Sequence, residues 1–271
     1  MLKVLSKSDI EICIIQEKKY DLTKIANRKN LVLFSGGIDS QALTLFLKNN
    51  NIHVETLFAK YCIDGSKKNF FNKYDNLTAE QLQIDHKLYL DLDKLYMEKN
   101  ITEEYFNLYR CTSPQFAVHL HIIDYAVKHF PDYNILLPST PILWQDTYGY
   151  KLYNWISYDE LVLYRYKESN NMVNLFPFFF LEFEVEKQII KSNVHNMKNA
   201  NMYTKKFLLY NDLGLPVIQQ DNSWTGFKEY KIHFKEKYGK PYDTILRNNH
   251  KSSKKKMAVK HWAYGNSNVY G

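Results

Sequence analysis

The chain has 271 residues, of which 45% are hydrophobic and 24% charged, and its formal net charge is +7. This composition is that of a soluble globular protein large enough for one domain, or for one domain with an appendage. The three scattered cysteines, Cys13, Cys62 and Cys111, exclude a disulfide framework and a CxxC zinc site, and they indicate a reducing compartment.

No membrane or export signal is visible. The first residues lack the apolar stretch of a secretory signal. The most apolar run, residues 173–183, contains Pro177 and is shorter than the roughly 20 residues that span a bilayer. We therefore expect a cytoplasmic protein without a membrane partner.

Predicted strands and helices alternate along the chain after a short N-terminal leader, residues 1–30, which we expect to pair at a sheet edge. The predicted strands cover 31–34, 53–58, 86–92, 133–138 and 173–179, and the predicted helices cover 39–48, 69–83, 113–129, 158–168, 182–193 and 227–238. This alternation predicts an α/β fold with a mostly parallel, doubly wound sheet and helices on both faces. Ligands bind such sheets beyond the carboxyl ends of the strands.

The most informative stretch is residues 31–40, LVLFSGGIDS. Four apolar residues run into a glycine pair and then into an amphipathic segment, which predicts a strand, a glycine turn and a helix start. Glycines let the backbone approach an anion closely, and the amide groups at a helix N-terminus attract it. The pattern predicts a phosphate site. The alternative is a tight turn in which Asp39 or Ser40 only caps the helix.

Two common phosphate motifs are absent. The stretch has neither the spacing nor the lysine of a Walker A loop, and it lacks the GxGxxG of a dinucleotide site. The remaining motif, SGGxDS, resembles that of the PP-loop ATP pyrophosphatases, or adenine nucleotide alpha hydrolases, a family that includes tRNA thiolation enzymes. The resemblance implies a HUP-like sheet. It also implies that a substrate oxygen attacks the α phosphate of ATP while pyrophosphate leaves from the loop.

The resemblance further implies a set of nucleotide contacts. The loop amides and the hydroxyls of Ser35 and Ser40 would hold pyrophosphate, while Asp39 would help to place Mg²⁺ or cap the helix. The backbone at the end of the second strand would meet the adenine, although Phe58 is equally explained as sheet core. The nucleotide-binding set is Ser35, Gly36, Gly37, Ile38, Asp39, Ser40, Phe58, Ala59 and Ser139, with Asp39 and Ser40 also assigned to catalysis and Asp39 to the metal.

Within 31–193, later segments resemble 7-cyano-7-deazaguanine synthase and its relatives. These segments are a helix entry at 110–116, a strand and loop at 135–150, and a strand-proline-helix step that starts at 175–177. Arg110 is the first candidate for the cation near the α phosphate, and a surface ion pair is its alternative. Asp146 and Tyr150 fit an aromatic-lined substrate pocket, unless Asp146 only forms a turn.

Two departures from those synthases stand out. No cysteine follows Cys111, so we expect no zinc. The lysine that usually follows the proline is absent from 178–186, and Lys187 comes late. Elsewhere, Asp91 and Asp93 alternate with leucines, which places both on one face of the strand predicted at 86–92.

The C-terminal part completes the predicted organisation: a leader at 1–30, an ATP-binding domain at 31–195 and a helical extension at 196–271. The extension ends in a basic tail, and either a solvated terminus or contact with a nucleic-acid backbone explains this charge. Its lysines are Lys251, Lys254, Lys255, Lys256 and Lys260.

Together these features predict an enzyme that adenylates a carbonyl or carboxylate oxygen with ATP and Mg²⁺, and then forms a C–N or C–S bond. The substrate would be a small molecule or a nucleobase. The alternative is a nucleotide-binding module that performs no chemistry and docks nucleic acid or a protein partner. The sequence leaves a homodimer open.

Overall fold

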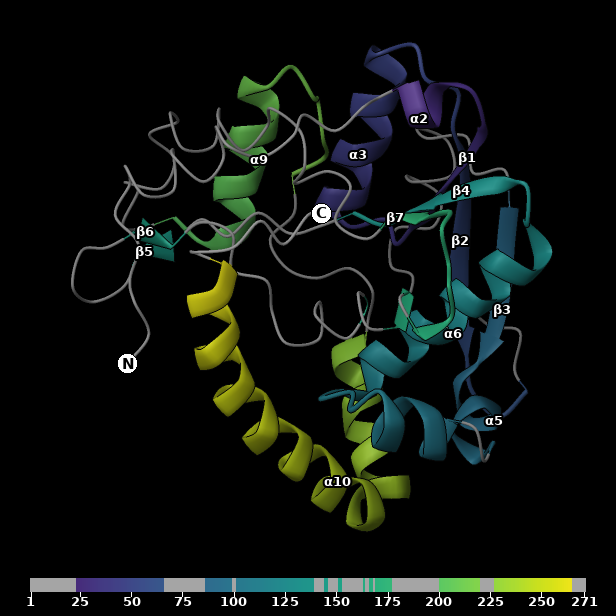
Figure 1. The fold of residues 1–271 in the computed structure, drawn as a ribbon, viewed down its shortest axis with the longest axis vertical. Helices are drawn as coiled ribbons and strands as arrows, with labels where there is room; N and C mark the ends of the chain where they lie inside the picture. Colours follow the sequence, from purple (N-terminus) through teal and green to yellow (C-terminus); the bar gives the residue numbers. More distant parts are fainter. Residues whose placement is uncertain are drawn as a thin grey trace.

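The computed structural model describes most of the predicted α/β domain and much of the C-terminal extension. The described residues are 23–65, 86–98, 101–138, 144–145, 151–152, 163, 166–167, 169–176, 200–219 and 227–264. A five-stranded sheet with the order β3-β2-β1-β4-β7 forms its centre (Figure 1), and every neighbouring pair in it is parallel. The strands are β1 (Lys29–Phe34), β2 (Glu55–Cys62), β3 (His86–Asp91), β4 (Tyr133–Leu136) and β7 (Leu175–Phe176). The predicted fold class is confirmed.

Alternating side chains of the central strands supply the cores on the two faces of the sheet. In β1, Leu31 packs into one cluster of buried residues and Val32 into the other, and Ile135 and Leu136 of β4 divide in the same way. All four side chains are fully buried. Strands buried on both faces are typical of parallel sheets, because crossover helices cover each side.

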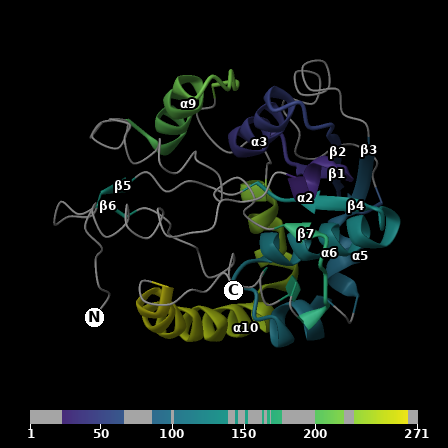
Figure 2. The same cartoon turned by 45° about the horizontal axis from the view of Figure 1, so that its top comes forward.

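Helices cover both faces, as Figures 1 and 2 show from two directions. On one face lie α3 and α9, whose buried residues share a cluster with Val32. On the other face lie α5, η1, α6 and the first part of α10, which share a cluster with Leu31. The helices are α2 (Thr23–Ala26), α3 (Ile38–Asn49), α5 (Leu92–Met97), the π-helix η1 (Ile101–Leu108), α6 (Pro114–His129), α9 (Met202–Asp212) and α10 (Phe227–Tyr264).

The sequence accounts for the start of α6. Ser113 is its N-cap and accepts a hydrogen bond from the amide of Phe116, and Pro114 occupies the first turn, where its missing N–H costs nothing. The predicted helix at 113–129 is therefore confirmed within one residue.

Several predicted elements have other bounds in the structure, and the differences at three of them matter for the site or the C-terminal extension. The strand predicted at 53–58 starts later and continues to Cys62, so Phe58 lies inside β2 instead of at its end. The strand predicted at 173–179 begins only at Leu175, because the backbone turns around Asn171, whose φ is 51°. The helix predicted at 227–238 continues to Tyr264, although Pro241 removes one helical hydrogen bond, and α10 is bent in Figure 1.

The assignment of Asp91 and Asp93 to one strand face was wrong. β3 ends at Asp91, whose carboxylate accepts a hydrogen bond from the amide of Lys94 and so caps α5. Asp93 lies in the first turn of that helix and is 4% exposed. The capping preference of aspartate outweighed the two-residue alternation of the leucines.

Other predicted elements lie partly or wholly outside the described residues. The helices predicted at 69–83 and 182–193 fall outside them, and the helix predicted at 158–168 is described only at 163 and 166–167, all helical. A short antiparallel pair, β5 (Trp144–Gln145) with β6 (Lys151–Leu152), lies apart from the main sheet. Among the described helices, none combines the length and apolar character required to cross a bilayer.

Candidate functional site

The glycine turn between β1 and α3 has the geometry that the sequence predicts. Gly36 adopts a φ of 75°, a left-handed conformation that side-chain-bearing residues rarely take. Gly37 is the N-cap of α3, and a Cβ built there would lie 3.1 Å from Ser35 Oγ. A glycine N-cap has no side chain to place over the first turn of α3. The turn is thus compact, with Gly36 buried and Gly37 half-buried.

Two serine hydroxyls line this turn. Ser40 Oγ donates a 2.8 Å hydrogen bond to the Gly37 carbonyl oxygen, and the Gly37 amide donates to Ser35 Oγ at 3.3 Å. The two Oγ atoms are 3.4 Å apart. Ser35 is exposed, whereas Ser40 is 1% exposed. The hydroxyls therefore meet at one point of the loop, with Ser35 on the solvent side.

The turn lies where ligands bind in this class of sheet. β1 stands between β2 and β4, and the strand order reverses there, because the chain proceeds from β1 to β2 and β3 on one side and to β4 and β7 on the other. The loop after β1 thus opens at the carboxyl edge of the sheet at its switch point.

Gln41 links the backbone of the glycine turn to the chain after α9, a role that was not predicted from the sequence. Its side chain is 1% exposed and donates from Nε2 to the Gly36 carbonyl oxygen at 3.0 Å. Its Oε1 accepts a 2.9 Å hydrogen bond from the amide of Ile218, which follows α9. A polar residue on the core side of a predicted helix was the one available signal. The loop backbone is thereby tied to the C-terminal extension.

Asp39, the acidic residue of the motif, is bound by two side chains of α9. Lys206 Nζ donates to Oδ2 at 2.7 Å, and the Tyr210 hydroxyl donates to Oδ1 at 2.7 Å. The side chain of Lys206 is 6% exposed and that of Asp39 20%. Burial, together with the charge of Asp39, raises the pKa of Tyr210 well above its usual value, so the phenol remains a donor. No sequence pattern linked positions so far apart.

The predicted adenine contacts lie beside the loop. Phe58 is opposite Phe34, the last residue of β1, and the two buried rings pack with centroids 6.4 Å apart. The Phe58 side chain therefore belongs to the core, and Ala59 follows it in the strand as β2 runs on past the end of β1. The adenine contact by this backbone remains a prediction.

Arg110 lies on the surface between η1 and α6. Its φ is 58°, its side chain is exposed, and it forms no ion pair with any residue that the structure describes. Its role at the α phosphate remains a prediction. Ser139, Asp146, Tyr150 and Lys187 lie outside the described residues, as does most of the loop that carries the deazaguanine-synthase resemblance.

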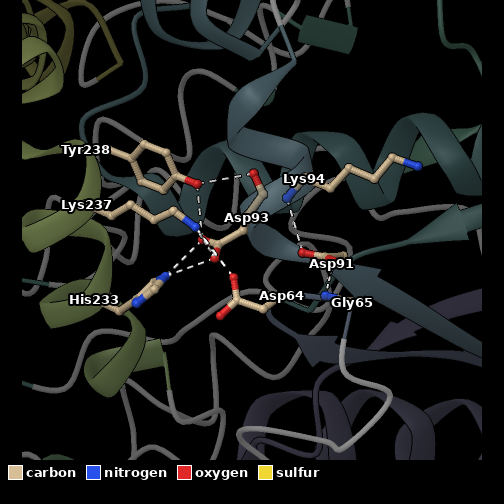
Figure 3. A network of polar contacts seen from close by, with 8 residues as sticks. All are labelled: Asp64, Gly65, Asp91, Asp93, Lys94, His233, Lys237 and Tyr238. Atoms are coloured by element: carbon tan, nitrogen blue, oxygen red, sulfur yellow. Dashed lines mark hydrogen bonds and ion pairs between the residues drawn. The ribbon is translucent and has the colours of Figure 1, made fainter.

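A second buried carboxylate, Asp93, forms a separate polar cluster (Figure 3). It accepts hydrogen bonds from Lys237 Nζ at 2.6 Å, His233 Nε2 at 2.9 Å and the Tyr238 hydroxyl at 3.1 Å. Burial alone would raise the pKa of Asp93, but the bonds from Lys237 and His233 lower it overall. Asp64 also approaches Lys237, at 3.6 Å. The cluster attaches α10 to the first turn of α5.

Metal ligands do not gather in the part of the chain that the structure describes. There, no three side chains of His, Cys, Asp or Glu are placed so that they could hold an ion together. Asp39 offers carboxylate oxygens in the first turn of α3, and both accept hydrogen bonds from α9.

Comparison with known proteins supports the PP-loop interpretation over part of the chain. No model of a protein family matches it. A curated protein, tRNA-specific 2-thiouridylase MnmA of Buchnera aphidicola subsp. Schizaphis graminum (strain Sg), is 34% identical over 80 residues. The chain is distantly similar to a PP-loop protein. The matched stretch is 30% of this chain and 22% of the relative, so the chain spans less than a quarter of the relative's length.

Proposed function

We propose that this protein is an ATP-dependent enzyme of the ATP pyrophosphatase type. A carbonyl or carboxylate oxygen of the substrate attacks the α phosphorus of ATP, the bond to the β phosphate breaks, and pyrophosphate leaves into the loop. A nitrogen or sulfur nucleophile then displaces AMP. One observation carries the proposal: in LVLFSGGIDS, residues 31–40, a strand runs into a left-handed glycine turn and a helix start at the switch point of a parallel sheet.

The local chemistry suits a polyphosphate leaving group. The amide dipoles of α3 point their positive end toward the turn, and the hydroxyls of Ser35 and Ser40 lie in it. Phosphoryl transfer needs mainly positioning and electrostatic stabilisation from a protein, and a rigid loop held from behind by Gln41 supplies the positioning.

Mg²⁺ would bind at the loop together with ATP and not to protein ligands alone. The ion prefers six oxygen ligands, and in nucleotide enzymes most of them are phosphate oxygens and water. Asp39 can contribute at most one carboxylate to that set, and it already pairs with Lys206 at 2.7 Å. The ligands would therefore come chiefly from the nucleotide, with Asp39 beside it.

For the acceptor, we propose a nucleobase in a nucleic acid, and sulfur or nitrogen as the incoming atom. The support is the distant relative, whose name describes thiolation of tRNA. Carbonyl groups of pyrimidine and purine bases offer an oxygen of the required kind. The proposal concerns the class of reaction.

The products decide the reaction type. ATP labelled at the α phosphate is incubated with the protein, a total RNA preparation and a sulfide or ammonium donor. We expect RNA-dependent AMP and pyrophosphate in equal amounts. Ser35→Ala should lower this activity at least tenfold, because it removes an exposed hydroxyl of the loop, whereas Asn107→Ala, an exposed change on η1, should leave it unchanged. Formation of ADP and phosphate instead would contradict the proposal.

A second candidate function, nucleic-acid binding without catalysis, is favoured by the continuation of α10. The helix runs to Tyr264 and thus carries the whole lysine cluster of the predicted tail. Lysines on a helix of this length can contact successive phosphates of a nucleic-acid backbone.

The salt dependence of binding tests this second function. Replacing Lys254, Lys255 and Lys256 together by glutamine should weaken binding to a fluorescent RNA hairpin and lower the slope of log Kd against log salt by about 2.7, since roughly three phosphate contacts to the duplex stem are lost. A control that replaces three exposed lysines elsewhere, Lys48, Lys87 and Lys94, changes the net charge equally. Equal weakening in both variants would show that the tail lysines make no specific contact with the RNA.

A further inference from the structure

The pairing of Lys206 with Asp39 brings a buried cation to the phosphate loop. Lys206 comes from α9, 167 positions after Asp39 in the sequence, and its ammonium group lies 2.7 Å from Oδ2. The lysine side chain is 6% exposed, whereas the carboxylate it meets is 20% exposed. Lysine is rarely buried to this degree unless it is paired. The carboxylate is thus the reason that the cation can stay inside.

Asp39 poses an electrostatic problem for a loop that receives phosphates. It lies in the first turn of α3, where the helix attracts anions, and its own negative charge would repel a polyphosphate. Tyr210 holds Oδ1 but is neutral, so it cannot cancel that charge. Lys206 can, because its ammonium group is charged and lies 2.7 Å from Oδ2.

Apolar contacts also hold α9 against α3. Leu209, Tyr210 and, after the helix, Leu215 are almost fully buried and share a cluster with Leu43 and Leu47 of α3. Apolar contacts of this size hold a helix in place without a charge pair. The docking of α9 therefore does not rest on the ion pair alone, and a second role of Lys206 at Asp39 can be tested.

We propose that Lys206 is a positioning residue that makes the loop receptive to phosphate by cancelling the charge of Asp39. It acts through Asp39 and touches neither ATP nor pyrophosphate. The inference rests on the proposed function, because it assumes that the loop binds the phosphates of ATP.

Pyrophosphate binding, measured by calorimetry, tests the inference without an acceptor. Lys206→Met should raise the Kd of pyrophosphate by roughly tenfold or more at low salt, because it removes the ammonium group that pairs with the Asp39 carboxylate. The double variant with Asp39→Asn and Lys206→Met should bind pyrophosphate more tightly than Lys206→Met when Mg²⁺ is left out, since both charges of the pair are gone and Asp39 has no ion to place. Lys206→Arg keeps the charge and should bind pyrophosphate better than Lys206→Met.

Two further variants separate charge from structure. Lys48→Met removes one positive charge at the other end of α3, about 13 Å from Asp39 along the helix, and should leave the Kd unchanged. Tyr210→Phe removes a neutral hydrogen bond to the same carboxylate and should change the Kd by less than about threefold. Melting temperatures of all variants report any loss of folding, so that weak binding is compared among folded proteins only.

The outcomes are distinct. If the double variant binds pyrophosphate as weakly as Lys206→Met, Lys206 contacts the phosphates directly and the inference is overturned. If Lys206→Met lowers only the melting temperature and leaves the Kd unchanged, the ion pair is structural and the inference is overturned. In either case the parent still binds pyrophosphate and the proposed function stands. If the parent protein binds neither pyrophosphate nor ATP, the proposed function fails and the inference fails with it.

Discussion

Two carboxylates of this protein occupy matching places and differ in what surrounds them. Asp39 and Asp93 each lie in the first turn of a helix that follows a parallel strand, and each accepts hydrogen bonds from a lysine and a tyrosine of the C-terminal helices. At Asp93 the carboxylate is enclosed, with 5% of its side chain exposed, and Lys237 is 39% exposed. At Asp39 the lysine is the more enclosed partner: the Lys206 side chain is 6% exposed and that of Asp39 is 20% exposed.

The difference in exposure suggests different roles: the Asp93 cluster attaches α10, whereas the Asp39 pair belongs to the proposed phosphate loop. His233 and Lys237 of α10 are partly exposed and donate to Asp93, which is enclosed. This cluster therefore fastens α10 to α5 (Figure 3). Around Asp39 the donor, Lys206, is the more enclosed partner. The free-energy cost of breaking each pair depends on which partner would be left buried.

The largest effect is therefore expected at Asp39. Asp39→Asn leaves the buried ammonium group of Lys206 without a counter-charge, and it should lower the free energy of unfolding by about 3–4 kcal/mol. Urea denaturation followed by circular dichroism measures this loss. Adding Lys206→Met to the same chain should recover most of it. A loss at Asp39 that is smaller than the loss at Asp93 would contradict the comparison.

Asp93→Asn is expected to cost about 2 kcal/mol. The cost is smaller because His233 and Lys237 are 27% and 39% exposed and can turn to water once the charge is gone. The same denaturation experiment measures it, and hydrogen exchange should show α10 opening more readily while α3 stays protected. Equal loss of protection in both helices would argue that Asp93 supports the whole fold and not the attachment of α10.

The sheet and the loop could be predicted from sequence because their signals are local. Four apolar residues before Gly36 define β1, and the glycine pair defines the turn. The partners of Asp39 could not be predicted, since Lys206 meets it only through tertiary packing of α9. The alternating leucines before Asp93 favour a strand, whereas Asp91 favours a helix N-cap. The sequence alone does not decide between these two preferences, and in the structure the cap ends the strand at Asp91.

The contribution of Asp93 to the free energy of unfolding should decrease at acid pH. The folded protein lowers the pKa of Asp93 below its ordinary value of 3.8, so its contribution to stability is present above about pH 4 and is lost as the pH falls through the folded pKa. The difference in unfolding free energy between the parent and Asp93→Asn should then shrink between about pH 4 and pH 2. A difference that stays constant over this range would show that Asp93 contributes through packing and not through its charge.

The smallest effect is expected for an exposed pair of the same chemistry. Arg247 lies four residues after Asp243 on α10, with its side chain 76% exposed and its guanidinium 3.7 Å from the carboxylate. Exposed pairs of this kind contribute about 0.5 kcal/mol or less, because water and salt screen them and both side chains lose freedom. Arg247→Gln should therefore change neither the unfolding free energy nor the pyrophosphate Kd beyond error. A loss of pyrophosphate binding in this variant would mean that α10 reaches the phosphate loop, and charge cancellation at Asp39 would then no longer suffice to explain how the loop accepts phosphate.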